Sequence, residues 1–129
     1  MTAPVREITE TFFAPDAAAW RAWLAAHHAD RSEIWLILLK RHVDEPSVTQ
    51  SEAVEEALCY GWIDGHLRRI DDRSHALRFT PRKPRSEWAQ SNKDRVERLI
   101  AAGRMAPPGL AAVAVAKANG SWDRPIRRP

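Results

Sequence analysis

Cysteine and long hydrophobic runs are both scarce in this chain of 129 residues. The single cysteine, Cys59, excludes an intrachain disulfide and is typical of proteins that fold in a reducing compartment. The longest apolar run, at residues 34–39, is far too short to cross a bilayer. The first residues lack the basic stretch and apolar core of a secretory signal peptide. We therefore expect a cytoplasmic protein without membrane insertion.

The common catalytic and cofactor signatures are also absent. The chain has no glycine-rich phosphate loop, no dinucleotide fingerprint and no Gly-x-Ser-x-Gly motif. Its five histidines and Cys59 do not follow the spacing of metal ligands. Cys59 falls in the last turn of a predicted helix, where a buried small side chain is commoner than a nucleophile. We expect no metal and no cofactor, and the sequence assigns no catalytic residue.

The charge of the chain is mildly positive, with 20 Lys and Arg against 17 Asp and Glu. This balance permits an anionic partner but falls well short of a nucleic-acid-binding tail. Hydrophobic residues make up 44% of the chain and charged residues 29%, which is ordinary for a globular domain of this length. The six tryptophans stand out, because tryptophan serves both cores and binding surfaces.

Apolar spacing and capping residues predict four helices, at residues 15–28, 49–60, 86–103 and 106–119. Trp20, Trp23 and Leu24 give the first helix an apolar face, and Thr49 with Glu52 matches a capping box at the start of the second. Predicted strands lie at residues 34–39, 62–71 and 75–82, with Phe12–Phe13 as a further short edge strand or as core residues. The run at 34–39 is apolar on both faces, which describes a central strand covered on both sides.

The order helix, strand, helix, strand, strand, helix, helix predicts an α+β fold. We expect a small mixed or antiparallel sheet of at least three strands, with about four helices packed on it. The step from 34–39 to the strand at 62 is long enough to run parallel, and Gly61 is predicted to turn the chain into that strand as a left-handed helix cap. Residues 1–123 are predicted as one globular domain, followed by a basic C-terminal tail at 124–129.

The stretch 60–88 contains the predicted hairpin, two tryptophans and seven Lys or Arg residues. Strict alternation places Ile63 and Leu67 on the buried face of its first strand. The other face then carries Trp62, Asp64, His66 and Arg68. A three-residue loop at 72–74 keeps the apolar residues of both strands on one side and pairs Leu67 with Phe79.

In that register the polar face contains three cross-strand pairs, namely Asp64 with Arg82, His66 with Thr80, and Arg68 with Arg78. Asp64 neutralises Arg82, but like charges directly opposite each other destabilise a strand pair. Nothing local neutralises Arg68 and Arg78, so this face is predicted to bind an anionic group. The alternative is a solvated strand face whose arginines splay into water.

Pro81 and Pro84 stiffen the loop after the hairpin, which carries three cations and leads to Ser86 as the predicted N-cap of the third helix. Free N–H groups beside a basic loop are a plausible anion site, and the alternative is a charged solvent loop. Asn92 is predicted to lie on the same helical stripe as Trp88. It therefore either satisfies loop backbone or faces a pocket.

Four segments resemble a known family. They are EAVEEALCYGWIDG at 52–65, RFTPRKPRSEW at 78–88, NKDRVERLIAAGRM at 92–105 and AKANGSW at 116–122. In order and spacing, over roughly residues 15–123, they resemble the N-terminal portion of the bacterial YdeI/OmpD-associated family, the bacteriocin-protection proteins. The resemblance implies a link to bacteriocin resistance, a form of stress resistance, and to outer-membrane porin expression. It implies no particular reaction.

Three functions compete on the sequence alone. The first is a binding module for an anionic small molecule or a protein partner. Its site would comprise Trp62, Asp64, His66, Arg68, Arg78, Arg82, Lys83, Trp88 and Asn92. The second is nucleic-acid binding through the same basic face, with tryptophans stacking on bases. The third is an enzyme that uses Asp64 or His66 as general acid or base, although a salt bridge to Arg82 or Arg68 is the commoner role for Asp64. The oligomeric state stays open.

Overall fold

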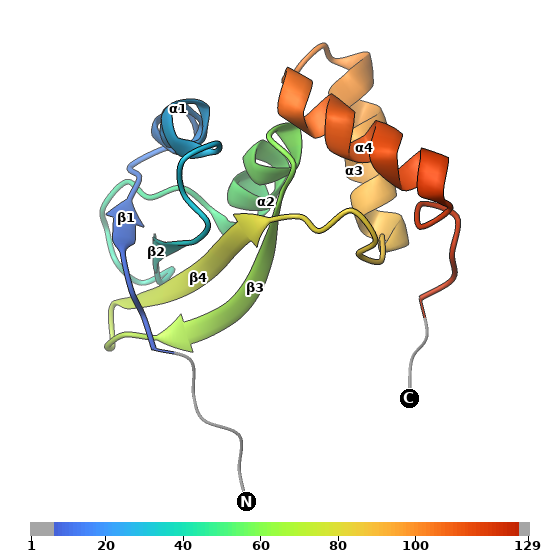
Figure 1. Ribbon diagram of the computed structural model, residues 1–129. Helices are drawn as coiled ribbons and strands as arrows, with labels where there is room; N and C mark the ends of the chain where they lie inside the picture. Colours follow the sequence, from blue (N-terminus) through green and yellow to red (C-terminus); the bar gives the residue numbers. More distant parts are fainter. Residues whose placement is uncertain (1–6, 127–129) are drawn as a thin grey trace, which may run out of the picture.

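The computed structural model describes residues 7–126 as four helices and four strands, which confirms the α+β class (Figure 1). The strands are β1 (Thr11–Phe13), β2 (Ile34–Leu39), β3 (Trp62–Arg69) and β4 (Ser74–Pro81). The helices are α1 (Ala17–His27), α2 (Gln50–Cys59), α3 (Gln90–Ala101) and α4 (Pro107–Asn119). The first six residues of the predicted domain and residues 127–129 of the predicted tail lie outside the described residues.

The strands form one mixed sheet in the order β1-β2-β4-β3. β1 runs parallel to β2, and the other neighbours are antiparallel. The predicted edge strand at Phe12 is confirmed, and β2 is an interior strand as expected. However, β4 lies between β2 and β3, so these two strands point the same way without pairing. Cover on both faces of β2 is complete only at its start, because Ile37 and Leu39 are half-buried.

Helix α1 packs on one face of the sheet. Asp16 caps it, since the Asp16 carboxylate accepts from the Ala19 backbone N–H at 2.8 Å, and the helix therefore begins two residues later than predicted. The ring of Trp20 lies 5.0 Å from that of Phe79. The Trp20 indole N–H also donates to the Ala53 carbonyl at 3.0 Å, which ties α1 to α2.

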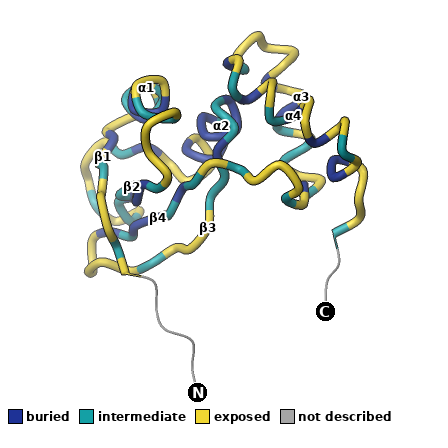
Figure 2. The backbone as a smooth tube through the Cα atoms, viewed as in Figure 1, coloured by how far each residue is buried: buried dark blue, intermediate teal, exposed yellow. Residues whose placement is uncertain are grey.

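Helix α2 separates two hydrophobic cores. The predicted capping box of Thr49 and Glu52 is present at its start. Ala57 faces the core between α1 and the sheet, whereas Leu58 and Cys59 face a second core that α3 and α4 complete. Figure 2 shows α2 buried along much of its length, between the sheet and the α3–α4 pair. Helices α3 and α4 therefore pack on α2 rather than on the sheet (Figure 1).

Helix α4 follows the prediction at both ends, whereas α3 follows it only at its end. Helix α3 starts at Gln90 after the N-cap Ala89, which makes no side-chain cap, so the predicted N-cap at Ser86 is wrong. Helix α4 ends at Gly120, which has a φ of 86°. Trp122 folds back onto the body as expected, with its ring 4.9 Å from that of Trp88. Within residues 7–126, no helix is long and apolar enough to cross a membrane.

Candidate functional site: the Arg82 pocket

The hairpin of β3 and β4 differs from its predicted register because β3 contains an irregularity between Asp64 and Leu67. Asp64 lies opposite Phe79, and Leu67 lies opposite Leu77, so two positions on β4 correspond to three on β3. Such a bulge reverses the alternation of side chains. Trp62, Asp64 and Leu67 therefore share the face that carries Phe79, and the predicted separation of Trp62 from Leu67 is wrong.

The predicted pairing of Arg68 with Arg78 is also wrong. Arg68 lies opposite Ala76. Arg78 donates from Nε to the Glu33 carboxylate at 2.5 Å. Hydrogen bonds from the Thr9 hydroxyl and from Arg78 hold the pKa of Glu33 below its ordinary value. Glu33 therefore neutralises Arg78. The argument for anion binding at this face required an unneutralised pair of arginines, and that pair does not form.

The two remaining cross-strand pairs are replaced as well. Thr80 lies opposite Ile63 rather than His66. His66 is exposed within the bulge. Arg82 lies just beyond β4, where its backbone N–H donates to the Gly61 carbonyl at 2.8 Å. The structure therefore removes Arg82 from the strand face on which the sequence placed it.

Arg82 instead occupies the junction between the sheet and α3. Its guanidinium lies over the Trp88 ring, 3.7 Å from the ring centre. Nη1 donates to the Ser86 hydroxyl at 2.8 Å and to the Glu87 carbonyl at 2.9 Å. Nε and Nη2 are buried and have no hydrogen-bond acceptor among the described residues. Burial lowers the pKa of Arg82 to about 10, and the nearby charge of Asp64 opposes this shift.

A cavity of about 250 Å³ lies beside Arg82, between the start of β3, the end of β4 and α4. We call it the Arg82 pocket. Tyr60, Trp62 and Pro84 supply apolar walls. Helix α4 closes the opposite side with Ala112 and its neighbours. Besides Arg82, the lining includes the exposed cation Lys83 and the His28 imidazole. The site is thus a small, largely apolar hollow with cations on one side.

Two glycines allow α4 to form a wall of this pocket. As predicted, Gly61 turns the chain from α2 into β3, with a φ of 75°. A Cβ at Gly61 would lie 3.1 Å from the Pro108 carbonyl oxygen. A Cβ at Gly109 would lie only 2.3 Å from the Cys59 carbonyl oxygen. Larger residues at either position would push α4 away from the strand start.

Asp64 and Asn92 are brought together, but in a different hollow of about 430 Å³ that Arg95 also lines. Arg95 donates to the Asn92 side-chain oxygen at 2.9 Å, which gives this half-buried amide a side-chain partner. Asp64 acts on Arg82 only through space, because the two form no ion pair among the described residues. The salt bridge that the sequence favoured for Asp64 with Arg82 is therefore not formed.

The two tryptophans of the predicted site are core residues. Trp62 is 1% exposed and meets Trp23 edge-on at 5.8 Å between ring centres. Trp88 is 3% exposed and precedes α3, so it does not share a helical stripe with Asn92. Trp62 contributes a wall of the Arg82 pocket, and the Trp88 ring stacks against the Arg82 guanidinium. Neither ring is an open platform for stacking.

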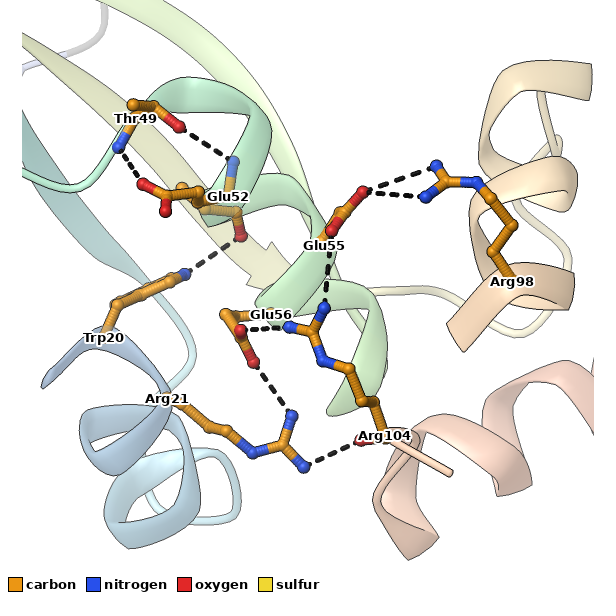
Figure 3. Close-up of polar contacts among 9 residues, drawn as sticks. Trp20, Arg21, Thr49, Glu52, Glu55, Glu56, Arg98 and Arg104 are labelled. Carbon is orange, nitrogen blue, oxygen red and sulfur yellow. Dashed lines mark hydrogen bonds and ion pairs between the residues drawn. The ribbon is translucent and has the colours of Figure 1, made fainter. Parts of the chain in front are cut away.

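Glu56 on α2 is a buried acid that the sequence did not single out. It is 4% exposed. Arg21 of α1 donates to one of its oxygens at 2.9 Å, and Arg104 donates to the other (Figure 3). Arg21 also donates to the Arg104 carbonyl at 2.8 Å. These arginines lie 35 and 48 positions from Glu56, so no local pattern could have linked them. We call the three residues the Glu56 clamp, because they join α1, α2 and the α3–α4 turn.

Cys59 lies close to the Glu56 clamp. Its side chain is fully buried, and burial raises the pKa of the thiol. The prediction that Cys59 is a small buried side chain is therefore confirmed. In the part of the chain that the structure describes, no three His, Cys, Asp or Glu side chains are grouped so as to hold a metal ion.

Comparison with known proteins places the chain in a family. Residues 12–112 match a family model described as "Domain of unknown function (DUF8412)". A search of curated proteins and a search of solved structures returned no significant match. The matched range includes Tyr60, Trp62, Arg82 and Lys83, and it extends into α4. The chain belongs to the DUF8412 family.

Proposed function

We propose that this protein is a binding module that takes a small anionic ligand with a planar or apolar body in the Arg82 pocket. The observation that supports this most directly is the Arg82 guanidinium. Trp88, Ser86 and Glu87 hold it in place, while two of its buried N–H groups lack an acceptor within residues 7–126. A buried donor without an acceptor costs about 1–3 kcal/mol. A carboxylate or phosphate supplies acceptors in a charge-assisted, bidentate geometry.

The rest of the pocket selects the body of the ligand. Tyr60, Trp62 and Pro84 present apolar surface, and Lys83 adds a second positive charge. The volume of about 250 Å³ falls just below the ~300–1,000 Å³ typical of small-molecule sites. This size favours a ligand with one or two rings over a nucleotide. We therefore propose an aromatic or cyclic acid as the ligand class.

The resemblance to the bacteriocin-protection proteins supports the same pocket. Segment 52–65 supplies Tyr60 and Trp62, and segment 78–88 supplies Arg82. On this basis we propose a cytoplasmic role in bacteriocin protection, with ligand binding as the molecular event. Expression of the wild type or of Arg82→Gln in a bacteriocin-sensitive strain tests this role. Protection by the wild type alone supports it, and equal survival of both strains argues against it.

The alternatives from the sequence have less support. Nucleic-acid binding relied on a shared face of Arg68 and Arg78, but Arg78 is engaged by Glu33. For an enzyme using Asp64 or His66, the two side chains do not share a cleft, because Asp64 lines the hollow with Asn92 and His66 is exposed in the bulge. A protein partner stays compatible with the same pocket if it presents a carboxylate there.

Isothermal titration calorimetry with indole-3-carboxylate and phenyl phosphate tests the proposal. We expect saturable binding that Arg82→Gln weakens roughly tenfold to a hundredfold, because hydrogen bonds to charged groups contribute about 1.5–3 kcal/mol. Lys83→Gln weakens binding without threatening the fold, since Lys83 is exposed. Arg85→Gln is the matched control, because Arg85 lies in the same loop but does not line the pocket.

Neutral indole-3-carboxamide and a short oligonucleotide complete the design. Binding of the carboxamide as tightly as the acid would contradict a site built on Arg82. Oligonucleotide binding that falls steeply with added salt would instead favour the nucleic-acid function. If neither acid binds and the oligonucleotide is also inert, the pocket is not a small-anion site and a protein partner becomes the preferred hypothesis.

A further inference from the structure

A larger cavity lies at the opposite end of α2 and of the hairpin from the Arg82 pocket. Its volume is about 630 Å³, which falls within the ~300–1,000 Å³ typical of small-molecule sites. The end of β2, the loop at 40–49 and the first residue of α2 enclose it, together with Leu67 of β3 and His75 of β4. We call it the Leu67 cavity. None of the residues predicted from the sequence as a binding site lines it.

The bulge in β3 brings Leu67 to this cavity. It turns Leu67 to the face of the sheet that α1 and α2 cover elsewhere, but Leu67 lies beyond their reach and is 48% exposed. Below it, Leu38 and Val48 are 7% and 2% exposed and form an apolar floor. Val43 adds a further aliphatic side chain from the loop. A half-exposed leucine above an apolar floor leaves hydrophobic surface that a ligand can cover.

The rim of the cavity is positively charged. Lys40 and Arg41 line it, and neither takes part in an ion pair among the described residues. Among the described residues, the acid in the lining is Glu45, which accepts from Arg73 Nη2 at 2.7 Å in an exposed ion pair. The cavity therefore offers two cations without a matching acid, next to aliphatic walls.

We propose that the Leu67 cavity is a second, separate binding site, for an unbranched aliphatic carboxylate such as a medium-chain fatty acid. The carboxylate would pair with Lys40 and Arg41, and the hydrocarbon chain would cover Leu67 and the floor. Apart from the His75 imidazole, no aromatic ring of the described residues lines the cavity, so it lacks the flat walls of the Arg82 pocket and suits a flexible chain. This inference does not depend on the function proposed for the Arg82 pocket.

Calorimetric titration with free hexanoate, octanoate and decanoate tests the proposal. Each buried methylene should tighten the dissociation constant by about fourfold. Leu67→Asn should weaken decanoate binding at least tenfold, and the Lys40→Gln/Arg41→Gln double variant should abolish the preference for decanoate over decanol. Leu110→Asn is the matched control. Leu110 is 44% exposed, much like Leu67, but it belongs to α4, and no α4 residue lines this cavity.

Arg82→Gln separates the two sites, since it should remove binding of indole-3-carboxylate and leave decanoate binding unchanged. Thermal unfolding of each variant checks that the fold is intact. Three results would overturn the proposal. They are affinity without chain-length dependence, equal binding of decyltrimethylammonium, and decanoate binding that survives Leu67→Asn in a folded protein.

Discussion

Arg82 is charged at an energetic cost that its neighbours only partly offset. Burial lowers the pKa of Arg82 to about 10, well below its ordinary value, so the folded protein holds this proton less tightly than the unfolded chain does. Stacking on Trp88 contributes about 0.5–2 kcal/mol, but two N–H groups find no acceptor in the part of the chain that the structure describes. An anion that supplies this acceptor raises the pKa again and must, by linkage, stabilise the fold.

Glu33 should make stability depend on pH in the acid range. Its folded-state pKa lies below the ordinary 4.5, chiefly because the Thr9 hydroxyl and Arg78 donate to it. Its contribution is therefore present above pH 4.5 and is lost as the pH falls through the folded-state value. Glu33→Gln should cost about 1–2 kcal/mol at pH 7 and flatten the loss of stability below pH 4.5. Urea denaturation across this range measures both effects.

Glu10→Gln serves as the control for this experiment. Glu10 is a nearby acid whose side chain is 49% exposed and pairs with Arg31 at 3.1 Å. An exposed pair of this kind contributes about 0–1 kcal/mol, so the control should keep nearly the wild-type acid profile. An unchanged acid profile in Glu33→Gln would show that the Glu33–Arg78 contact does not contribute to stability.

At the scale of elements, local patterns carried most of the fold. Apolar periodicity located every helix, the capping box of Thr49 and Glu52 fixed the start of α2, and the glycine after α2 fixed the start of β3. The bulge was the main failure. A glycine within a strand is a known signal of a bulge, and Gly65 lies between Asp64 and Leu67, where the register shifts. Reading Gly65 as a bulge would have placed Trp62 and Leu67 on one face.

The candidate site was less predictable than the elements, because its contacts join distant parts of the chain. Glu33, the partner of Arg78, lies 45 positions away in the chain. Helix α4 closes the Arg82 pocket, although the whole of α3 separates it from Arg82 in the sequence. Trp62, Arg82 and Lys83, which the sequence analysis grouped in one site, do line the same cavity. Their predicted geometry failed because side-chain direction at a strand end depends on register, which the sequence did not determine.

Gly61→Ala should be unusually costly. At φ 75° an alanine loses about 1–2 kcal/mol to backbone strain. Its Cβ would also lie 3.1 Å from the Pro108 carbonyl oxygen, and crowding of a packed site adds about 1–3 kcal/mol. We expect a total loss of about 2–5 kcal/mol in urea denaturation, together with weaker binding in the Arg82 pocket.

Gly103→Ala measures the cost of backbone strain without the cost of crowding. Gly103 has a similar φ of 70°, but nothing lies within 4 Å of the position of its added Cβ. Its substitution should therefore cost only the strain of about 1–2 kcal/mol. Equal losses for the two variants would mean that the approach of α4 to Gly61 contributes nothing to stability.

The whole molecule consists of two hydrophobic cores that share α2. The Glu56 clamp lies across their junction, because Arg21 belongs to α1 and Arg104 to the α3–α4 turn (Figure 3). The two pockets lie at opposite ends of α2. The Arg82 pocket lies between the sheet and α4, and the Leu67 cavity lies against the far end of α2. Relative movement of the two cores would therefore change the Arg82 pocket first.

Glu56→Gln should destabilise both cores together. Breaking a buried ion pair costs about 3–5 kcal/mol, but the partners Arg21 and Arg104 are 33% and 43% exposed, so we expect about 1–3 kcal/mol. Tryptophan fluorescence and circular dichroism should still report one coincident transition. Glu55→Gln is the control and should cost less than about 1 kcal/mol, because its contacts to Arg98 and Arg104 are 3.4 and 3.6 Å long. Two separate transitions in Glu56→Gln would show that the clamp is what couples the cores.

The most direct test of the central claim is the NMR signal of the Arg82 Nε–H during titration with indole-3-carboxylate. This proton is buried, which slows its exchange with water, and it has no acceptor among the described residues. Binding in the Arg82 pocket predicts a saturable downfield shift of this resonance, as expected for a new charge-assisted hydrogen bond. A resonance that stays unchanged while the ligand binds would contradict the account, because the anion would then be held elsewhere.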